Sequence, residues 1–288
     1  MKKFLQLLGL GVLLHTSAQA GHDNAPIGAR AIGMGNASVT LRDSWSMFNN
    51  IGGLAGVKQK EVGVFVGNKF NNKSFTTVAA GFAAPLRENK NGVIAVNVQR
   101  FGDDLLSQSR AGIGYGHQIA GVSLGIQVDY LQTSVSEIGS KGVFGIQFGG
   151  VAEITPELLI GAHIFNVTQA KIADYQNERL PTVMKAGLSY RPTKTLMLNI
   201  ETEKDIDYKA RVKAGVEYEI VKKVYLRTGI NTNNFSNFFG IGVKQSLFDF
   251  DYAATTHTKL GWSHAFSLSY KFLSRKTSAK PSNPSADL

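Results

Sequence analysis

The chain has 288 residues, a formal net charge of +10 and no cysteine. Without cysteine it can be neither a lipoprotein nor a disulfide-stapled secreted domain. The composition is rich in Gly, Phe and Tyr, and there is no long apolar run beyond the amino terminus, which excludes a helical membrane protein. A positive charge of this size is also found in nucleic-acid-binding proteins, but an exported protein meets little nucleic acid, and much of the excess lies near the chain ends. We expect no nucleic-acid partner.

The amino terminus has the pattern of a secretory signal. A basic pair at 2–3 precedes an apolar stretch at 4–14 and the small-residue cleavage site Ala-Gln-Ala at 18–20. The apolar stretch is too short for a membrane-spanning helix, which needs ~20 residues. We predict a signal peptide over residues 1–20 and a mature chain that begins at Gly21.

Residues 21–57 differ in composition from the rest of the mature chain. They contain a small-residue run from Ala29 to Ala37, a turn that Asp43 can cap, and a glycine-rich end at 52–56. Small residues permit close approach of backbones, which suits a segment packed inside a narrow space. The alternative, a floppy leader, does not account for the large side chains in this stretch. We predict a plug or hatch over 21–57, with Arg30, Met34, Trp45 and Phe48 as its site residues.

From residue 58 to 272 the chain reads as a succession of strands. The predicted strands are 60–70, 74–84, 92–101, 110–119, 121–132, 141–152, 157–166, 182–191, 195–203, 210–220, 222–231, 237–245, 247–255 and 263–272. Most have about ten residues, the length of a tilted transmembrane strand, whereas strands of soluble proteins cluster near ~5–6 residues. The fold class we predict is therefore all-β: a fourteen-stranded antiparallel transmembrane β-barrel with an amino-terminal plug.

The stretch 210–220 illustrates the pattern of these strands. Its apolar and charged residues alternate with period two, so one face of the strand is apolar and the other charged. A soluble sandwich and a membrane barrel both allow this alternation. Short turns on one side and mostly longer polar connections on the other, such as 102–109 and 133–140, favour the barrel. Two connections, 71–73 and 85–91, depart from this rule.

The charged faces should line the lumen of the barrel. Unpaired charges there would be costly, so we expect them to pair between strands and with the plug. The predicted lumen residues are Lys185, Glu201, Arg211, Lys213, Glu217, Arg227 and Lys244. Two roles remain open for these residues, a structural charge ladder and a selectivity filter.

The last predicted strand ends in Phe272, and such a terminal aromatic resembles the signal that barrel-assembly machinery reads. Residues 273–288 are rich in Ser, Lys and Pro, which indicates a disordered periplasmic tail. We expect a protein of the bacterial outer membrane with both termini in the periplasm.

Catalytic and metal chemistry finds little support in the sequence. Ser263 lies between His257 and His264, but no Gly-x-Ser-x-Gly motif accompanies them, so we expect no catalytic residues. The carboxylates at 249 and 251 and at 103–104 do not form a calcium-loop pattern. We expect no metal site, no cofactor and no enzyme.

Several short motifs carry a family resemblance. Residues 28–37 are similar to an Ala-Arg-Ala…Gly-Met-Gly signature, Asp43 and 53–55 come next in the same order, and 260–268 resemble a final hairpin. On these residues the chain resembles the long-chain fatty-acid transporter (FadL-like) superfamily, and within it the PorV/PorQ-type proteins of Bacteroidetes. It departs from the family at 50–53, where Asn-Ile-Gly-Gly replaces Asn-Pro-Ala-Gly.

The resemblance implies two different functions. PorV/PorQ-type proteins are accessory, cargo-handling components of type IX secretion, so the partners would be other secretion-system proteins or exported cargo. FadL-like transporters instead bind a hydrophobic ligand and pass it through an opening in the barrel wall. Both functions imply contact with outer-membrane lipid.

Overall fold

A computed structural model describes residues 25–87, 92–171, 179–232 and 236–273. The predicted signal peptide and all but Leu273 of the predicted tail lie outside the described residues.

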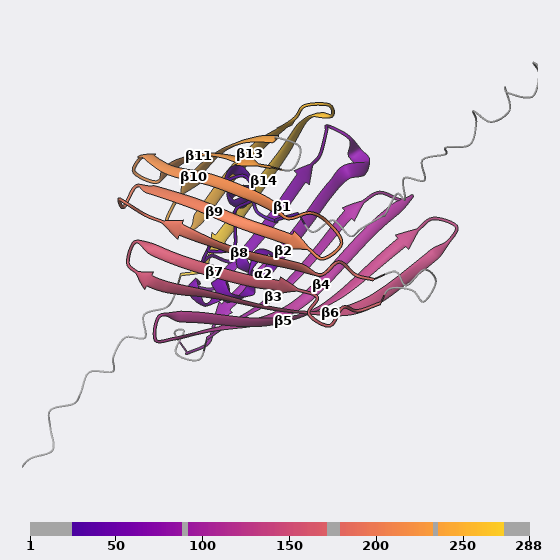
Figure 1. The fold of residues 1–288 in the computed structure, drawn as a ribbon, viewed down its shortest axis with the longest axis horizontal. Helices are drawn as coiled ribbons and strands as arrows, with labels where there is room; N and C mark the ends of the chain where they lie inside the picture. Colours follow the sequence, from indigo (N-terminus) through magenta and orange to yellow (C-terminus); the bar gives the residue numbers. More distant parts are fainter. Residues whose placement is uncertain (1–24, 88–91, 172–178, 233–235, 274–288) are drawn as a thin grey trace, which may run out of the picture.

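Fourteen strands form one closed barrel in which every pair of neighbours is antiparallel and β1 closes the sheet against β14 (Figure 1). This confirms the predicted fold class. The strands are β1 (Glu61–Asn68), β2 (Thr76–Pro85), β3 (Val93–Gly102), β4 (Leu106–Ile119), β5 (Val122–Val135), β6 (Gly139–Thr155), β7 (Leu158–Phe165), β8 (Val183–Tyr190), β9 (Leu196–Asp205), β10 (Arg211–Val221), β11 (Val224–Asn231), β12 (Ser236–Lys244), β13 (Phe248–His257) and β14 (Gly261–Lys271).

Three adjacent strands are longer than the sequence predicted. β4 and β5 each have 14 residues and β6 has 17, so their hairpins project from one end of the barrel (Figure 1). The polar stretches assigned to loops at 102–109 and 133–140 are largely paired strand, with Ser107 opposite Ser134. The loop prediction is wrong here because antiparallel strands beyond an apolar band can face water, so polarity does not mark their ends.

The two faces of the barrel wall differ as the alternation in β10 predicts. Val212 and Tyr218 are 39% and 47% exposed on the outer surface, whereas Lys213 and Glu217 are 2% and 5% exposed and face inward. The closed topology excludes the soluble sandwich, in which the apolar faces of two sheets would meet. No helix in the described part of the chain is long and apolar enough to cross a membrane.

Residues 25–57, which we call the lumenal segment, lie inside the barrel. The segment contains α1 (Ala29–Gly33), α2 (Ser46–Asn49) and the 3₁₀-helix η1 (Ile51–Gly56); a further 3₁₀ turn, η2 (Lys73–Phe75), belongs to the first hairpin. The apolar side chains of the segment share a buried cluster with wall residues of β1 to β3, β13 and β14. Trp45 and Phe48 stack within this cluster, with ring centroids 6.2 Å apart. The lumen therefore holds its own hydrophobic core.

Glycines of the wall let the backbone of the lumenal segment lie directly against the strands. A Cβ added at Gly229 would come 2.2 Å from the backbone nitrogen of Gly35, and one at Gly215 would come 2.3 Å from the carbonyl oxygen of Met34. Such distances are far below van der Waals contact, so no other residue fits without a shift of the backbone.

The first and last described residues lie at opposite ends of the barrel. Ala25 lines a cavity together with Asn68 and His257, where β1 and β13 end, whereas Lys271 pairs with Glu61 at the start of β1. We call these the upper and the lower end. The described chain thus begins near the upper end and ends near the lower one. The chain ends themselves lie outside the described residues, so the placement of both termini in the periplasm stays a prediction.

Candidate functional site

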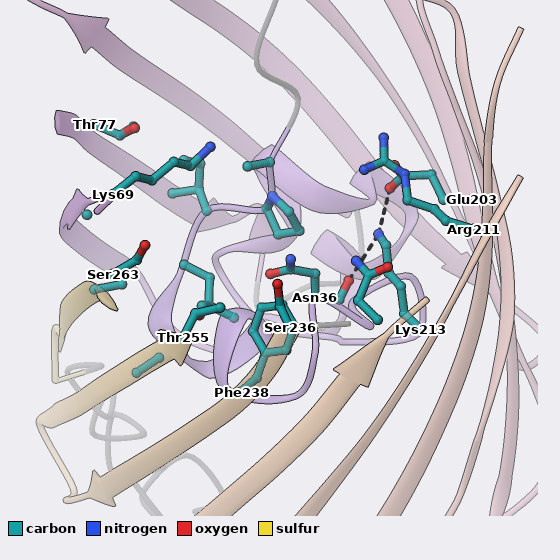
Figure 2. A pocket seen from close by; sticks show the side chains of 18 of the residues that line it. Asn36, Lys69, Thr77, Glu203, Arg211, Lys213, Ser236, Phe238, Thr255 and Ser263 are labelled. Carbon is teal, nitrogen blue, oxygen red and sulfur yellow. Dashed lines mark hydrogen bonds and ion pairs between the residues drawn. The ribbon is translucent and has the colours of Figure 1, made fainter. Parts of the chain in front are cut away.

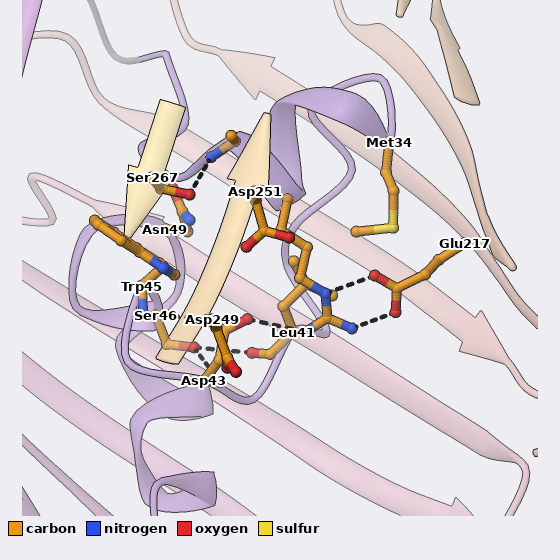
Figure 3. Close-up of polar contacts among 12 residues, drawn as sticks. Met34, Leu41, Asp43, Trp45, Ser46, Asn49, Glu217, Asp249, Asp251 and Ser267 are labelled. Carbon is orange, nitrogen blue, oxygen red and sulfur yellow. Dashed lines mark hydrogen bonds and ion pairs between the residues drawn. The ribbon is translucent and has the colours of Figure 1, made fainter. Parts of the chain in front are cut away.

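A chain of alternating charges joins the lumenal segment to the wall near the lower end. Arg30 donates to both carboxylate oxygens of Glu217, at 2.8 and 2.6 Å, and to Asp43 at 2.9 Å (Figure 3). Arg227 donates to Glu217 at 2.6 Å and to Asp251 at 2.7 Å. Burial opposes the charge of Arg30, but the carboxylates of Glu217 and Asp43 outweigh it and raise the pKa of Arg30. The segment is therefore held by a paired, charge-assisted contact.

A second cluster lies nearer the upper end, on β8 to β10. Lys213 donates to Glu201 at 2.8 Å and to Glu203 at 2.6 Å, and Arg211 donates to Glu203 at 2.9 Å (Figure 2). Lys185 lies 3.8 Å from Glu203. Three cations thus surround one carboxylate, and the group is nearly closed to solvent apart from Arg211, whose side chain is 34% exposed.

The second cluster also holds the backbone of the lumenal segment. One oxygen of Glu201 accepts hydrogen bonds from the backbone N–H groups of Ser38 and Val39, both at 2.7 Å. Lys213 donates to the carbonyl oxygen of Asn36 at 3.3 Å. Backbone groups that have no partner within the segment are thereby satisfied by the wall.

A third polar cluster on β4 to β7 was not singled out by the sequence. Arg110 donates to both oxygens of Asp129, at 2.9 and 3.1 Å, and Gln127 and Gln147 each donate to Asp129 at 2.7 Å. His163 lies 2.7 Å from Gln147. These residues occupy the same inward positions of the period-two pattern as the predicted set, and this signal could have identified them.

The seven predicted lumen residues fall into three groups. Glu217 and Arg227 belong to the first cluster, and Lys185, Glu201, Arg211 and Lys213 to the second. Lys244 stands apart, with its ammonium group 4.6 Å from the ring centroid of Tyr225. Of the predicted plug residues, Arg30 carries the first contact, while Met34, Trp45 and Phe48 are buried.

A cavity of about 900 Å³, which we call the vestibule, opens at the upper end. Figure 2 shows Glu203, Arg211 and Lys213 together on one side of the vestibule, and Phe238 away from them, near Ser236. The apolar lining includes Ile27, Ile32, Phe65, Phe238, Ala253 and Ala265. The vestibule thus combines an apolar surface with polar and charged side chains, among them the partly exposed guanidinium of Arg211 and the lysines Lys69 and Lys209. Small-molecule sites likewise combine apolar surface with a few polar groups.

A smaller cavity of about 420 Å³ opens at the lower end, between the lumenal segment and β12 to β14. Its lining carboxylates are engaged: Asp249 accepts from Lys271 at 2.6 Å, and Asp251 is bound to Arg227. In the described ranges no group of three or more His, Asp or Glu could hold a metal ion.

The histidines at the upper end do not form a hydrolytic site with Ser263. Ser263 lines the vestibule and accepts a hydrogen bond from the backbone of Phe70. His264 stacks on Trp262 and lies 2.8 Å from the hydroxyl of Tyr252. Nδ1 of His257 accepts from two backbone N–H groups of its own loop. None of these contacts joins a histidine to the serine hydroxyl.

These features define a closed fourteen-stranded barrel with a filled lumen and a vestibule at one end. No protein-family model matches the chain, and no curated protein matches its sequence. Among solved structures, the toluene transporter TbuX of Ralstonia pickettii is similar with a TM-score of 0.68 at 11% identity, over 87% of this chain and 100% of that chain. The P. putida toluene transporter TodX gives 0.66 at 12%, over 87% and 99%. A Pseudomonas aeruginosa FadL homologue gives 0.58 at 11%, over 86% and 98%.

The structural neighbours are thus FadL-family barrels of the bacterial outer membrane, and the chain shares their fold.

Proposed function

We propose that the chain is an outer-membrane barrel that takes up small hydrophobic or amphipathic molecules into the vestibule, with the lumenal segment as a plug. The observation that carries this proposal is the vestibule itself, whose volume of about 900 Å³ lies within the usual range for ligand sites. The shared fold with two toluene transporters supports it. The strands projecting at the upper end favour that end as the extracellular one.

The lining of the vestibule indicates the chemistry of its ligand. Phe65 and Phe238 offer aromatic surface to an apolar body. Arg211 is bound to Glu203 through Nε, which leaves other N–H donors for a polar end group, whereas Lys213 is fully engaged. A molecule with an apolar body and a polar end group fits this lining, because apolar and polar side chains both face the cavity.

The lumenal segment blocks the direct route from the vestibule to the lower end. It is held by charge clusters and by backbone contact with wall glycines, so we expect it to remain in the lumen while the ligand binds. The charged lumen residues predicted from the sequence would then serve to hold the lumenal segment in place, and not as a selectivity filter.

Replacing Ala265 with tryptophan should close the vestibule. Ala265 is 4% exposed and lines the apolar side, so an indole there would occupy the space of the ligand. We expect binding of a toluene or long-chain fatty-acid probe to the purified barrel to weaken at least tenfold, about 1.4 kcal/mol. The matched control is Ala186→Trp, which places the same group on the outer face of β8. Equal affinities of the two variants would refute the proposed site.

A second candidate function is an accessory, cargo-handling role in outer-membrane protein export, as the family resemblance implies. The projecting β4–β6 hairpins favour it, because their tips expose large apolar side chains: Leu105 is 71% and Ile138 84% exposed. The two tips adjoin, since the backbone N–H of Ser136 donates to the carbonyl oxygen of Leu105, and a contiguous apolar patch there would suit contact with a partner protein. This role requires no passage through the lumen.

Replacing Ile138 with aspartate tests the accessory role. The residue lies at a hairpin tip and is almost fully exposed, so we expect the barrel to fold normally while protein secretion by cells carrying the variant falls several-fold. Lys141→Asp, at the neighbouring start of β6, serves as a control for added negative charge. Normal secretion in a deletion strain would rule out this candidate.

A further inference from the structure

The outer face of the described strands carries few charged side chains. The register alternates outward and inward residues, and the outward set consists mainly of Val, Ile, Leu and aromatic residues. Lys204 and Arg100 are the two charged residues at outward positions of these strands. Lys204 donates a hydrogen bond to the backbone carbonyl of Tyr208.

Arg100 differs from Lys204 because it has no hydrogen-bond or ion-pair partner among the described residues. It is exposed near the upper end of β3, between Val78 of β2 and Ser109 of β4, and Ser109 is followed on β5 by Gln132. Three polar side chains therefore lie side by side on adjacent strands, in a wall whose outward side chains are mainly apolar. A guanidinium with its donors unused is a poor neighbour for hydrocarbon.

An apolar groove of about 600 Å³ lies next to this polar row. Its lining includes the small side chains Ala80 and Ala111, which leave a depression between the larger Val98 and Tyr130. Tyr130 packs against Phe144 with ring centroids 5.1 Å apart. Aromatic pairs on the outer face mark the depth at which lipid head groups begin.

We propose that this surface binds a phosphate-bearing lipid of the outward-facing leaflet. Arg100 would hold the phosphate, because the planar guanidinium fork matches its oxygens and Ser109 and Gln132 add donors beside it. An acyl chain would lie in the groove over Ala80 and Ala111. Three observations support this occupant: the charge of Arg100 suits a phosphate, Tyr130 indicates the depth of the lipid head groups, and the groove has room for an acyl chain.

The site is separate from the vestibule, although the two are close. Phe65 and Gln99 line both, so only the wall lies between them. Ala265 lines the vestibule and not the groove. Ala265→Trp should therefore leave lipid binding unchanged, which makes a failure of the proposed ligand site distinguishable from a failure of the lipid site.

The test uses the purified barrel in mild detergent, titrated with bisphosphorylated lipid A and monitored by native mass spectrometry. We expect Arg100→Gln to weaken binding at least tenfold, Arg100→Lys to weaken it less, and the matched control Lys204→Gln to leave it unchanged. Ala111→Phe fills the groove and should also weaken binding. Heat-modifiable migration on gels shows that each variant is folded.

Four outcomes would overturn the proposal. In the first, Arg100→Gln binds lipid A as tightly as the unaltered protein does. In the second, Lys204→Gln loses as much affinity as Arg100→Gln, which would mean that any cation on the outer face attracts the lipid phosphates. Dephosphorylated lipid A could bind equally well, or toluene or a fatty acid could displace lipid A from the groove. Inorganic phosphate at millimolar concentration should not compete, because the acyl chain supplies much of the contact.

Discussion

Replacing Glu217 with alanine should loosen the lumenal segment more than any other single change among the charged residues. Glu217 accepts two hydrogen bonds from Arg30 and one from Arg227, and its side chain is 7% exposed. Its removal leaves two buried guanidinium groups short of a carboxylate, and breaking a buried pair in this way costs about 3–5 kcal/mol. We expect a lower unfolding temperature in detergent and faster proteolysis within residues 25–57.

The matched control is Glu219→Ala on the same strand. Glu219 accepts one hydrogen bond, from the backbone of Lys223 at 2.7 Å, so its loss should cost only about 1 kcal/mol. A double-mutant cycle of Arg30→Ala with Glu217→Ala should give a coupling free energy of about 0.5–3 kcal/mol. If Glu217→Ala and Glu219→Ala unfold at the same temperature, the contact with Arg30 does not anchor the segment.

Replacing Gly229 with alanine should be a strongly damaging small change at the contact between the wall and the lumenal segment. The added methyl group would lie 2.2 Å from the backbone nitrogen of Gly35 and 2.4 Å from the carbonyl carbon of Met34. Neither atom can rotate away, so the lumenal segment must shift. Overpacking of this kind costs about 1–3 kcal/mol. Thermal unfolding and limited proteolysis of the segment would both report it.

Gly150→Ala provides a control, because here we expect the added methyl group to leave the stability of the barrel unchanged or to raise it slightly. The nearest atom to its added Cβ is Cδ2 of the Leu124 side chain, at 3.1 Å, and this group can move. Alanine is favoured over glycine in a strand interior by about 0.5–1 kcal/mol, so Gly150→Ala should be neutral or slightly stabilising. If the two alanine variants were equally stable, the wall glycines would not be required for close contact with the segment.

The sequence by itself determined the number of strands and the faces of most of them. Period-two alternation is a local property, and residues such as Val212 and Lys213 show it without knowledge of their neighbours. It did not determine where β4, β5 and β6 end. Their upper parts are polar on both faces, and only pairing such as that of Ser107 with Ser134 shows that they are strand.

Only the tertiary structure decided which charges meet. Arg30 and Glu217 are separated by 187 positions in the chain, and Arg110 and Asp129 were absent from the predicted set although both occupy inward positions. The glycines of the wall likewise acquire their meaning only from the backbone of the segment that lies against them. Alternation states toward which face a side chain points, but closure of the barrel around residues 25–57 fixes which side chains come within reach of one another.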